Sequence, residues 1–225
     1  MLIKLLGREM HNYLISQEEL EKFKGFLGKR GIKLEKFYSK GTTSLIFLGK
    51  ERNKEVIIKL ERPDTPRKNL QREANILRVL KGHEISPLLI DHGIFENREF
   101  LVREFAIGEP LLYTTPEKDH LLQILEETYK LDLLGIDHGQ IQGGKHIIIG
   151  DHVWIIDFEK ASLRRKPKNV TTAMAMIFLN NNVISKRVRE KFKINPMFLE
   201  TLRKELKQYK ETKNIEKIKE LLCGL

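Results

Sequence analysis

The spacing of apolar residues changes about halfway along this chain, and this change limits the folds that the chain can adopt. Between residues 33 and 105, short apolar runs are separated by polar turns, which is typical of a β-meander. From residue 118 onward, apolar residues recur at helical spacing, apart from one short hairpin. The sequence therefore predicts an α+β fold with a β-rich first half and a mostly helical second half.

The first half is predicted to contain two helices and five strands. The first helix, Gln17–Lys29, has Ser16 as its N-cap and a capping-box glutamate three residues later. The second helix, Asn69–Lys81, follows the strand-ending prolines Pro63 and Pro66. The strands are expected at Lys33–Ser39, Leu45–Gly49, Glu55–Leu60, Leu88–Phe95 and Glu99–Phe105.

The second half is predicted to begin with a helix over Lys118–Leu134. Its expected apolar stripe consists of Leu122, Leu125, Tyr129 and Leu133. A hairpin of two short strands follows, His146–Ile149 and Val153–Ile156. From Thr171 onward the pattern is helical, with breaks near residues 180–182 and 195–196.

These patterns predict three segments. They are an N-terminal helical extension over residues 1–32, a β-rich lobe over 33–105 and a reduced helical lobe over 106–225. The expected hinge is Ala106–Pro110. A β-rich lobe followed by a helical lobe is one arrangement that creates a ligand-binding cleft at the joint.

Composition excludes several classes of protein. The single cysteine, Cys223, cannot form an intrachain disulfide, and no cysteine–histidine spacing typical of zinc sites occurs. Residues 1–10 lack the apolar core of a signal peptide, and no uncharged run reaches the ~18 residues that span a bilayer. We therefore expect a cytoplasmic protein in a reducing environment, with no membrane partner. The net charge of +10 favours anionic partners, although surplus surface lysine in a heat-adapted protein gives the same balance.

A lysine within an apolar strand is the first candidate functional residue. Lys59 lies in the run Val56–Leu60, and such a lysine needs a counter-charge or an anionic ligand. Glu73 projects near the apolar stripe of the second helix and is the natural partner of Lys59. Two alternatives remain open, namely an edge lysine that reaches solvent and a glutamate that pairs with Lys81 or with solvent.

Two further segments carry residues suited to phosphate and metal binding. The turn Gly41–Ser44 joins the first two strands, and its amides and hydroxyls would cradle a phosphate unless it serves only as a turn. Asp157 ends the run Val153–Ile156, which delivers a carboxylate to a strand end where it would hold Mg²⁺. The alternative is an aspartate that caps a turn.

The order of these features resembles the signature set of protein kinases. The matching features are a turn glycine at Gly41, a strand lysine at Lys59, a helix glutamate at Glu73, the loop His138-Gly139 and the pair Asp157-Phe158. The resemblance covers about residues 34–162. The His-Gly form of the loop and the short chain look more like RIO-type and other small atypical kinases, or aminoglycoside phosphotransferases, than like typical eukaryotic kinases. Among these, the chain resembles a small archaeal-type family of predicted Ser/Thr kinases.

The resemblance implies a bilobal protein-kinase-like fold that binds ATP and Mg²⁺. Under this resemblance Lys59 holds the α- and β-phosphates, and Glu73 orients Lys59. The triphosphate would be covered by Gly41, Thr42, Thr43 and Ser44, the adenine bonded by the backbone at Glu104 and Ala106, and Mg²⁺ bound by Asp157.

The loop that would carry the transfer chemistry departs from the family pattern. With His138 aligned to the loop histidine, Gln140 stands where the family has its catalytic aspartate, and glutamine cannot accept a proton as a carboxylate does. Asp137 substitutes for that aspartate only if the loop backbone is reset. The metal-binding asparagine falls on Lys145 or, if one residue is inserted, on His146, and we favour His146. Lys145 would then offset phosphate charge.

A basic stretch follows the Asp157-Phe158 pair. It would contact phosphate, RNA or an acidic protein through Arg164, Arg165, Lys166 and Lys168, and the alternative is a solvated loop. The leading expectation is an enzyme, an ATP- and Mg²⁺-dependent Ser/Thr protein kinase of atypical type with an unknown protein substrate. The alternatives are a nucleotide-binding pseudokinase or scaffold, a small-molecule kinase, and an RNA- or ribosome-associated factor that uses the basic surface.

Overall fold

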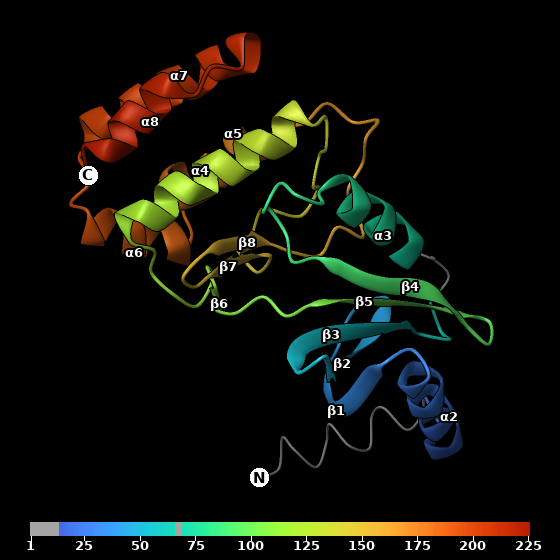
Figure 1. Cartoon of the computed structure of the whole chain (residues 1–225). Helices are drawn as coiled ribbons and strands as arrows, with labels where there is room; N and C mark the ends of the chain where they lie inside the picture. The colour runs from blue at the N-terminus through green and yellow to red at the C-terminus, as the bar shows by residue number, and fades with distance from the viewer. Residues whose placement is uncertain (1–13, 66–68) are drawn as a thin grey trace. The chain divides into compact units, whose positions relative to one another are not determined.

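The computed structural model of the chain describes residues 14–65 and 69–225 (Figure 1). These residues form two compact units. Unit 1 contains the described residues up to Lys81 together with Pro87–Phe105, and unit 2 contains Gly82–Ser86 and Ala106–Leu225. Residues 1–13 of the expected N-terminal extension, and Pro66, lie outside the described residues. Both units contain helices and a sheet, so the fold is mixed α+β.

Unit 1 is built on a five-stranded antiparallel sheet. Its strands are β1 (Ile32–Lys40), β2 (Ser44–Glu51), β3 (Lys54–Glu61), β4 (Leu89–Phe95) and β5 (Arg98–Glu104). They follow the order β1-β2-β3-β5-β4, which places β3 in the middle of the sheet. All five predicted strands are confirmed, because apolar runs and the polar turns between them are local signals.

The first helix of unit 1 covers one face of this sheet. This helix, α2 (Gln17–Gly28), begins directly after Ser16, the predicted N-cap, whose hydroxyl accepts a hydrogen bond from the backbone of Glu19. Its fully buried Phe23 contacts aromatic rings on three strands, those of Phe47, Phe95 and Phe100. Burial of these large rings fixes α2 on the sheet.

The second helix of unit 1, α3 (Leu70–Val79), packs against β4 and β5 from the opposite face. Strand β3 shows how the two faces are separated, since successive side chains of a strand point to opposite sides. Ile58 and Leu60 belong to the apolar cluster that contains α2. Lys59, between them, reaches a side chain of α3 instead. The sheet therefore presents a lysine to α3 and an apolar surface to α2.

Unit 2 combines a small sheet with several helices. Its strands are β6 (Glu109–Pro110), β7 (Ile147–Ile149) and β8 (Val153–Ile155). Its helices are α4 (Lys118–Leu133), α5 (Asn169–Met174), the π-helical turn η1 (Ala175–Leu179), α6 (Val183–Lys191), α7 (Pro196–Thr212) and α8 (Glu216–Cys223). Helices α7 and α8 lie side by side, and α8 also packs on α4 (Figure 1). The predicted helix, hairpin and helical breaks are confirmed.

The apolar face of α4 differs from the predicted stripe. Leu125 is buried as expected, but Leu133 is 62% exposed, and the buried face includes Leu121, Leu131 and Asp132. The face is rotated because a buried aspartate belongs to it, as described below. Among the described residues, no helix is both long enough and apolar enough to cross a membrane.

The predicted hinge Ala106–Pro110 is only partly irregular. Glu109 and Pro110 form strand β6, which pairs with β7. No local sequence pattern predicts this strand. This pairing needs a close approach, since a Cβ atom on Gly108 would lie 2.3 Å from the carbonyl oxygen of Ile149, and the φ of Gly108 is +138°. The end of the predicted hinge is therefore fixed within unit 2.

Candidate functional site

Lys59 and Glu73 form a buried ion pair in unit 1. Lys59 Nζ and Glu73 Oε2 lie 2.7 Å apart, and the two side chains are 4% and 0% exposed. Strand β3 is central in the sheet, so the alternative of an edge lysine is wrong. The predicted pairing of Lys59 with Glu73 is confirmed, because the strand and helix periodicities that place the two side chains are both local.

Helix α3 is held over the sheet by further polar contacts. The backbone N–H of Gln71, in the first turn of α3, donates to Glu99 Oε2 at 3.0 Å. The backbone N–H of Glu99 in turn donates to Glu61 Oε2 on β3 at 3.1 Å. These bonds fix the start of the helix that carries Glu73. Burying two opposite charges costs several kcal/mol per ion, so such a pair persists only where its surroundings hold it in good geometry.

The turn Gly41–Ser44 is closed upon itself. The backbone N–H of Gly41 donates to the carbonyl of Ser44 at 2.8 Å, and a Cβ atom on Gly41 would lie only 3.1 Å from that oxygen. Arg62 Nη1 donates to the carbonyls of Gly41 and Thr42 at 2.9 and 3.1 Å. Ser44 is buried as the first residue of β2. Phosphate binding by Gly41, Thr42, Thr43 and Ser44 stays a prediction, and Arg62, which the sequence did not single out, holds the turn.

The residues expected to contact adenine lie on either side of the boundary between the units. The backbone N–H of Glu104 donates to the carbonyl of Leu88 at 2.9 Å, and its carbonyl accepts from Arg103 Nη1 at 2.8 Å. Both backbone groups of Glu104 therefore have partners within unit 1. Ala106, the other predicted contact, is a buried residue of unit 2.

His138 anchors the loop of residues 137–146 inside unit 2. Its imidazole is fully buried and contacts the ring of Phe158, with ring centroids 4.7 Å apart. The backbone N–H of Gln140 donates to Nδ1 at 3.2 Å, so Nε2 carries the proton and donates to the carbonyl of Ile156 at 3.0 Å. Burial lowers the pKa of His138 to about 4. At neutral pH this histidine is an uncharged positioning residue rather than a proton donor to substrate.

The same loop brings His146 next to Asp157. Strands β7 and β8 pair Ile147 with Ile155, and the backbone N–H of Ile156 donates to the carbonyl of His146. This register places His146 Nδ1 3.4 Å from Asp157 Oδ2. Asp157 has a φ of 68°, a left-handed conformation that is uncommon outside glycine and that often marks functional positions.

The pair His146–Asp157 fits a divalent cation in part. Two neighbouring ligands of an octahedral cation such as Mg²⁺ lie about 3.0 Å apart at ligand distances of ~2.1 Å, so a separation of 3.4 Å needs only a small adjustment. The carboxylate oxygen of Asp157 is a ligand that Mg²⁺ prefers. The imidazole nitrogen of His146 suits Mn²⁺ and later transition metals better. The donor set therefore accepts a cation but is less selective for Mg²⁺ than a purely oxygen site.

Asp137 forms an ion pair with Arg165. Its carboxylate is 4% exposed, and its Oδ2 accepts from Arg165 Nε at 2.6 Å. Arg165 crosses Gly139 to make this bond, because a Cβ atom on Gly139 would lie 2.6 Å from Arg165 Nη2. Asp137 also pairs through its backbone with Ser162 in both directions. One of its two carboxylate oxygens is therefore held by Arg165.

The other two predicted residues of the loop have more exposed side chains. Gln140 is half-buried and uses its backbone N–H to bind His138. Lys145 is exposed. The loop therefore unites His138, His146 and Asp157, whereas Asp137 belongs to a separate contact with Arg165.

A buried polar network, which the sequence did not reveal, holds the loop to three helices. Asn169 Oδ1 accepts from the backbone N–H of His138 at 3.0 Å, and Asn169 Nδ2 donates to Asp132 Oδ1 on α4 at 2.8 Å. Asp132 Oδ2 accepts from the hydroxyl of Tyr209 on α7 at 2.6 Å. This bond and burial raise the pKa of Tyr209. The one available signal was an aspartate next to the apolar stripe of the predicted helix.

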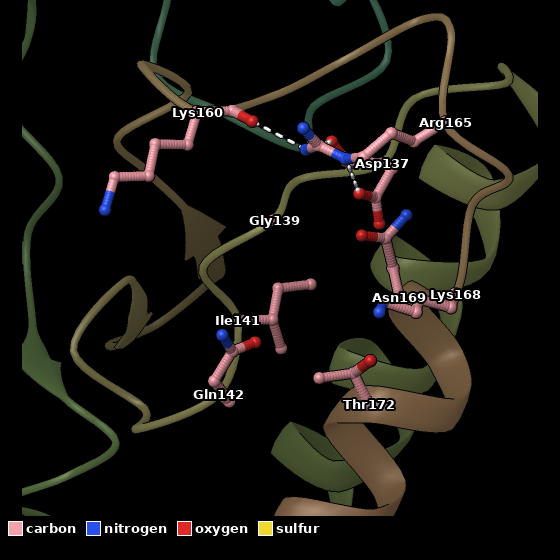
Figure 2. Close-up of a pocket in the computed structure, with 9 residues that line it drawn as sticks. All are labelled: Asp137, Gly139, Ile141, Gln142, Lys160, Arg165, Lys168, Asn169 and Thr172. Carbon is pink, nitrogen blue, oxygen red and sulfur yellow. Dashed lines mark hydrogen bonds and ion pairs between the residues drawn. The ribbon is translucent and has the colours of Figure 1, made fainter.

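A cavity of about 200 Å³ adjoins the loop on the side of Asp137 (Figure 2). The loop supplies Gly139, Ile141 and Gln142 to one side of it, and the start of α5 supplies Asn169 and Thr172 to the other. Figure 2 shows Gln142 and Thr172 on either side of this space. The cavity thus offers neutral hydrogen-bonding groups beside the loop, and its lining also includes the charged residues Asp137, Lys160, Arg165 and Lys168.

Comparison with known proteins yields one informative similarity. No protein-family model matches the chain. The chain is 39% identical over 115 residues to the uncharacterized protein MJ1211 of Methanocaldococcus jannaschii. The aligned part covers 98% of that protein and 48% of this chain. The similarity therefore extends over nearly the whole relative and about half of this chain.

Proposed function

We propose that this chain, which belongs to the family of the uncharacterized protein MJ1211 of Methanocaldococcus jannaschii, is an ATP- and Mg²⁺-dependent phosphotransferase. Its acceptor would be a Ser or Thr hydroxyl of a protein, and its fold would be a reduced form of the protein-kinase-like fold. The relative carries no assigned activity, so the proposal depends on the residues of this chain.

The observation that carries the proposal is the buried pair of Lys59 and Glu73. A lysine on a central strand, 4% exposed and 2.7 Å from a fully buried glutamate, is costly to maintain for stability alone, because well-packed apolar residues commonly serve as well. The pair becomes useful where Lys59 must hold phosphate oxygens in a fixed position. Glu73 would set the position of the Lys59 ammonium group, and α3 would hold Glu73.

Unit 2 would supply the remaining groups. Asp157 and His146 would bind the cation, whose chemistry is to neutralise the charge of the phosphates. His138 would keep the loop in place through its bonds to Gln140 and Ile156. The proposal requires the residues of both units to act on one nucleotide, which variants in each unit test separately.

A specific observation favours a second candidate, a protein that binds nucleotide without transferring phosphate. Gln140 cannot act as a general base, and the carboxylate of Asp137 is engaged by Arg165. General-base catalysis contributes roughly 10²–10⁴-fold to rate, so its absence would leave slow turnover or none. Under this candidate Lys59, Glu73 and Asp157 keep their binding roles.

Binding of ATP by the full chain, measured by calorimetry with Mg²⁺ and with Mn²⁺, tests what both candidates share. Lys59→Met and Asp157→Asn should each weaken binding at least about tenfold, because each removes a charge that contacts phosphate or cation. Lys54→Met is the matched control, since Lys54 lies on the same strand with a side chain that is 72% exposed. Equal binding by all four proteins would contradict a nucleotide site at these residues.

Replacement of Gln140 by aspartate separates the two candidates. If the loop is otherwise competent, Gln140→Asp restores a carboxylate and should raise the rate of phosphate transfer or ATP hydrolysis by roughly 10²-fold or more. Labelled ATP with Mg²⁺ or Mn²⁺ measures both reactions. Transfer by the unmodified chain that disappears in Asp157→Asn supports the enzyme. Binding without turnover in the unmodified chain and in Gln140→Asp supports the second candidate.

A further inference from the structure

Two segments of unit 2 that are distant in sequence bring four lysines around one cavity. The basic stretch after Ser162 supplies Lys166 and Lys168, and the end of α7 supplies Lys210 and Lys213. The cavity measures about 300 Å³ and is also lined by Pro167 and the ring of Tyr209. The sequence predicted an anionic partner for the basic stretch alone, and α7 doubles the number of lysines available to such a partner.

The charges around this cavity are not balanced by the protein. No carboxylate lines the cavity, and within residues 14–65 and 69–225 no acidic side chain forms an ion pair with any of the four lysines. Lys213 instead lies over the ring of Tyr209, 4.9 Å from its centroid. Like charges that share one cavity repel one another, and a polyanion bound there would relieve the repulsion.

Lys168 connects this cavity to the cavity beside the loop, whose other charged lining residues are Asp137, Lys160 and Arg165. It lines both cavities, so that the lysine-rich cavity and the space in Figure 2 meet at one residue. The cavity beside the loop offers the amide of Gln142 and the hydroxyl of Thr172, and among the described residues neither side chain has a hydrogen-bond partner. An amide donates and accepts at once, which matches the edge of a nucleobase.

We propose that unit 2 binds a single-stranded nucleic acid across these two cavities. The lysines around the larger cavity contact backbone phosphates, and Gln142 and Thr172 contact an unpaired base in the smaller one. The larger cavity, about 300 Å³, is at the lower end of the range of ligand pockets, and the smaller one, about 200 Å³, has room for a base rather than for a whole nucleotide. A duplex keeps its bases stacked and paired, so no single base can enter the smaller cavity.

An acidic peptide fits these cavities less well. Stable protein interfaces are centred on buried aromatic or aliphatic anchors, and Tyr209, the aromatic residue here, is 1% exposed. Carboxylates also need donors only, which leaves the acceptor oxygens of Gln142 and Thr172 unused. Lysines next to the neutral donor and acceptor groups of Gln142 and Thr172 correspond to a phosphate next to a base in a nucleic acid strand.

Fluorescence anisotropy with a fluorescein-labelled, unstructured 12-nucleotide RNA tests the proposal on the full chain without ATP. Four phosphate contacts predict that log K falls with log salt concentration with a slope of about −3. The double variant Lys210→Gln/Lys213→Gln should weaken binding roughly tenfold and reduce the slope by about 1.4. Both lysines lie outside the predicted nucleotide residues, so this result does not depend on ATP binding.

A charge-matched control distinguishes a site from general attraction. Lys186→Gln/Lys204→Gln removes the same charge from exposed lysines of unit 2 that line neither cavity, and binding should stay within about twofold. Equal weakening by both double variants would overturn the proposal, as would the absence of RNA binding at 50 mM salt. Circular dichroism of every variant checks that it is folded.

Two further arms test the kind of partner. Thr172→Val keeps the size of the side chain and should lower RNA affinity about threefold or more with an unchanged salt slope, because it removes a neutral contact. Duplex RNA of the same sequence should bind at least tenfold more weakly. A poly-glutamate peptide that displaces the RNA at equal charge concentration, or a duplex that binds equally well, would overturn the assignment to a single strand.

Discussion

Two ion pairs of nearly equal length occupy candidate positions in the two units, and their surroundings differ. Lys59 Nζ lies 2.7 Å from Glu73 Oε2, and Arg165 Nε lies 2.6 Å from Asp137 Oδ2. Both partners of the first pair are buried, whereas the side chain of Arg165 is 50% exposed. Length alone therefore says little about how firmly a pair is held. Exposure decides how much free energy is lost when one partner is removed.

The difference matters because the two pairs have opposite relations to the proposed chemistry. The pair of unit 1 places Lys59 where a phosphate-binding lysine is expected. The pair of unit 2 holds one oxygen of Asp137, the carboxylate nearest in sequence to the expected catalytic position. Since Arg165 remains half exposed to water, opening its pair costs less than opening the pair of Lys59 and Glu73. The pair of unit 1 is thus shielded from water, and the pair of unit 2 is accessible to it on the side of Arg165.

The largest effect is expected from Lys59→Met. It leaves Glu73 as a buried charge without Lys59 and should lower the free energy of unfolding of unit 1 by about 3–5 kcal/mol. Lys59→Met/Glu73→Leu replaces both charges with apolar side chains and should recover most of that loss without restoring ATP binding. Hydrogen exchange of the β3 amides measures stability within unit 1. A stable Lys59→Met protein would show that the pair is not held more firmly than that of unit 2.

The second effect concerns His138 in unit 2 and depends on pH. The pKa of His138 is about 4 in the folded chain and ~6.5 when unfolded, so the unfolded chain takes up a proton first as the pH falls. Stability is complete above pH 6.5 and should decrease by about 3 kcal/mol as the pH falls to 4. The fluorescence of Trp154, the single tryptophan, follows chemical unfolding of unit 2.

The control for this prediction is the exposed histidine His83, also in unit 2. His138→Gln should remove most of the decrease between pH 6.5 and 4, whereas His83→Gln should leave it unchanged. An unfolding midpoint that varies with pH equally in both variants would show that another group is responsible. The burial of His138 would then not explain how the stability of unit 2 depends on pH.

These contrasts also show what sequence can predict here. The pairing of Lys59 with Glu73 was predictable because each side chain is placed by its own strand or helix, and both patterns lie within 14 residues of each other. The hairpin that brings His146 to Asp157 was equally local. The assignment of phosphate, adenine and cation to these residues comes from a resemblance, and it stays a prediction.

The network around the loop could not be predicted, because its members meet only in the folded chain. Asp132, Asn169 and Tyr209 lie on α4, α5 and α7, and 77 residues separate Asp132 from Tyr209. The predicted stripe of α4 counted apolar residues alone, so it included the exposed Leu133 and left out Asp132. The same limit applies to Arg165, whose bond to Asp137 joins residues 28 positions apart with the β7–β8 hairpin between them.

A third prediction compares the pair of unit 2 directly with that of unit 1. Arg165→Met should lower the unfolding free energy of unit 2 by about 2 kcal/mol, less than Lys59→Met in unit 1, because water solvates part of the site. Trp154 fluorescence gives the value, and the double variant Asp137→Asn/Arg165→Met gives the coupling between the two side chains. A loss of unfolding free energy as large as that of Lys59→Met would mean that the exposure of Arg165 does not weaken its pair with Asp137.

The smallest expected effect concerns the identity of the bound cation. It tests which metal ion the loop of unit 2 prefers. Because His146 offers nitrogen beside the oxygen of Asp157, the chain should bind Mn²⁺ at least as tightly as Mg²⁺. His146→Asn supplies an oxygen and should move the ratio of the two dissociation constants toward Mg²⁺ by about tenfold, or 1.4 kcal/mol. Calorimetry with each metal, in the presence of ATP, measures the ratio.

His152→Asn is the control, since His152 lies beyond β7 at the other end of the hairpin and should leave the ratio unchanged. If His146→Asn leaves the ratio unchanged as well, His146 is not a ligand, and Asp157 acts with oxygens of the nucleotide alone. In that case the loop positions Asp157 but supplies no second metal ligand. Unit 2 then departs further than unit 1 from the protein-kinase pattern that the sequence resembles.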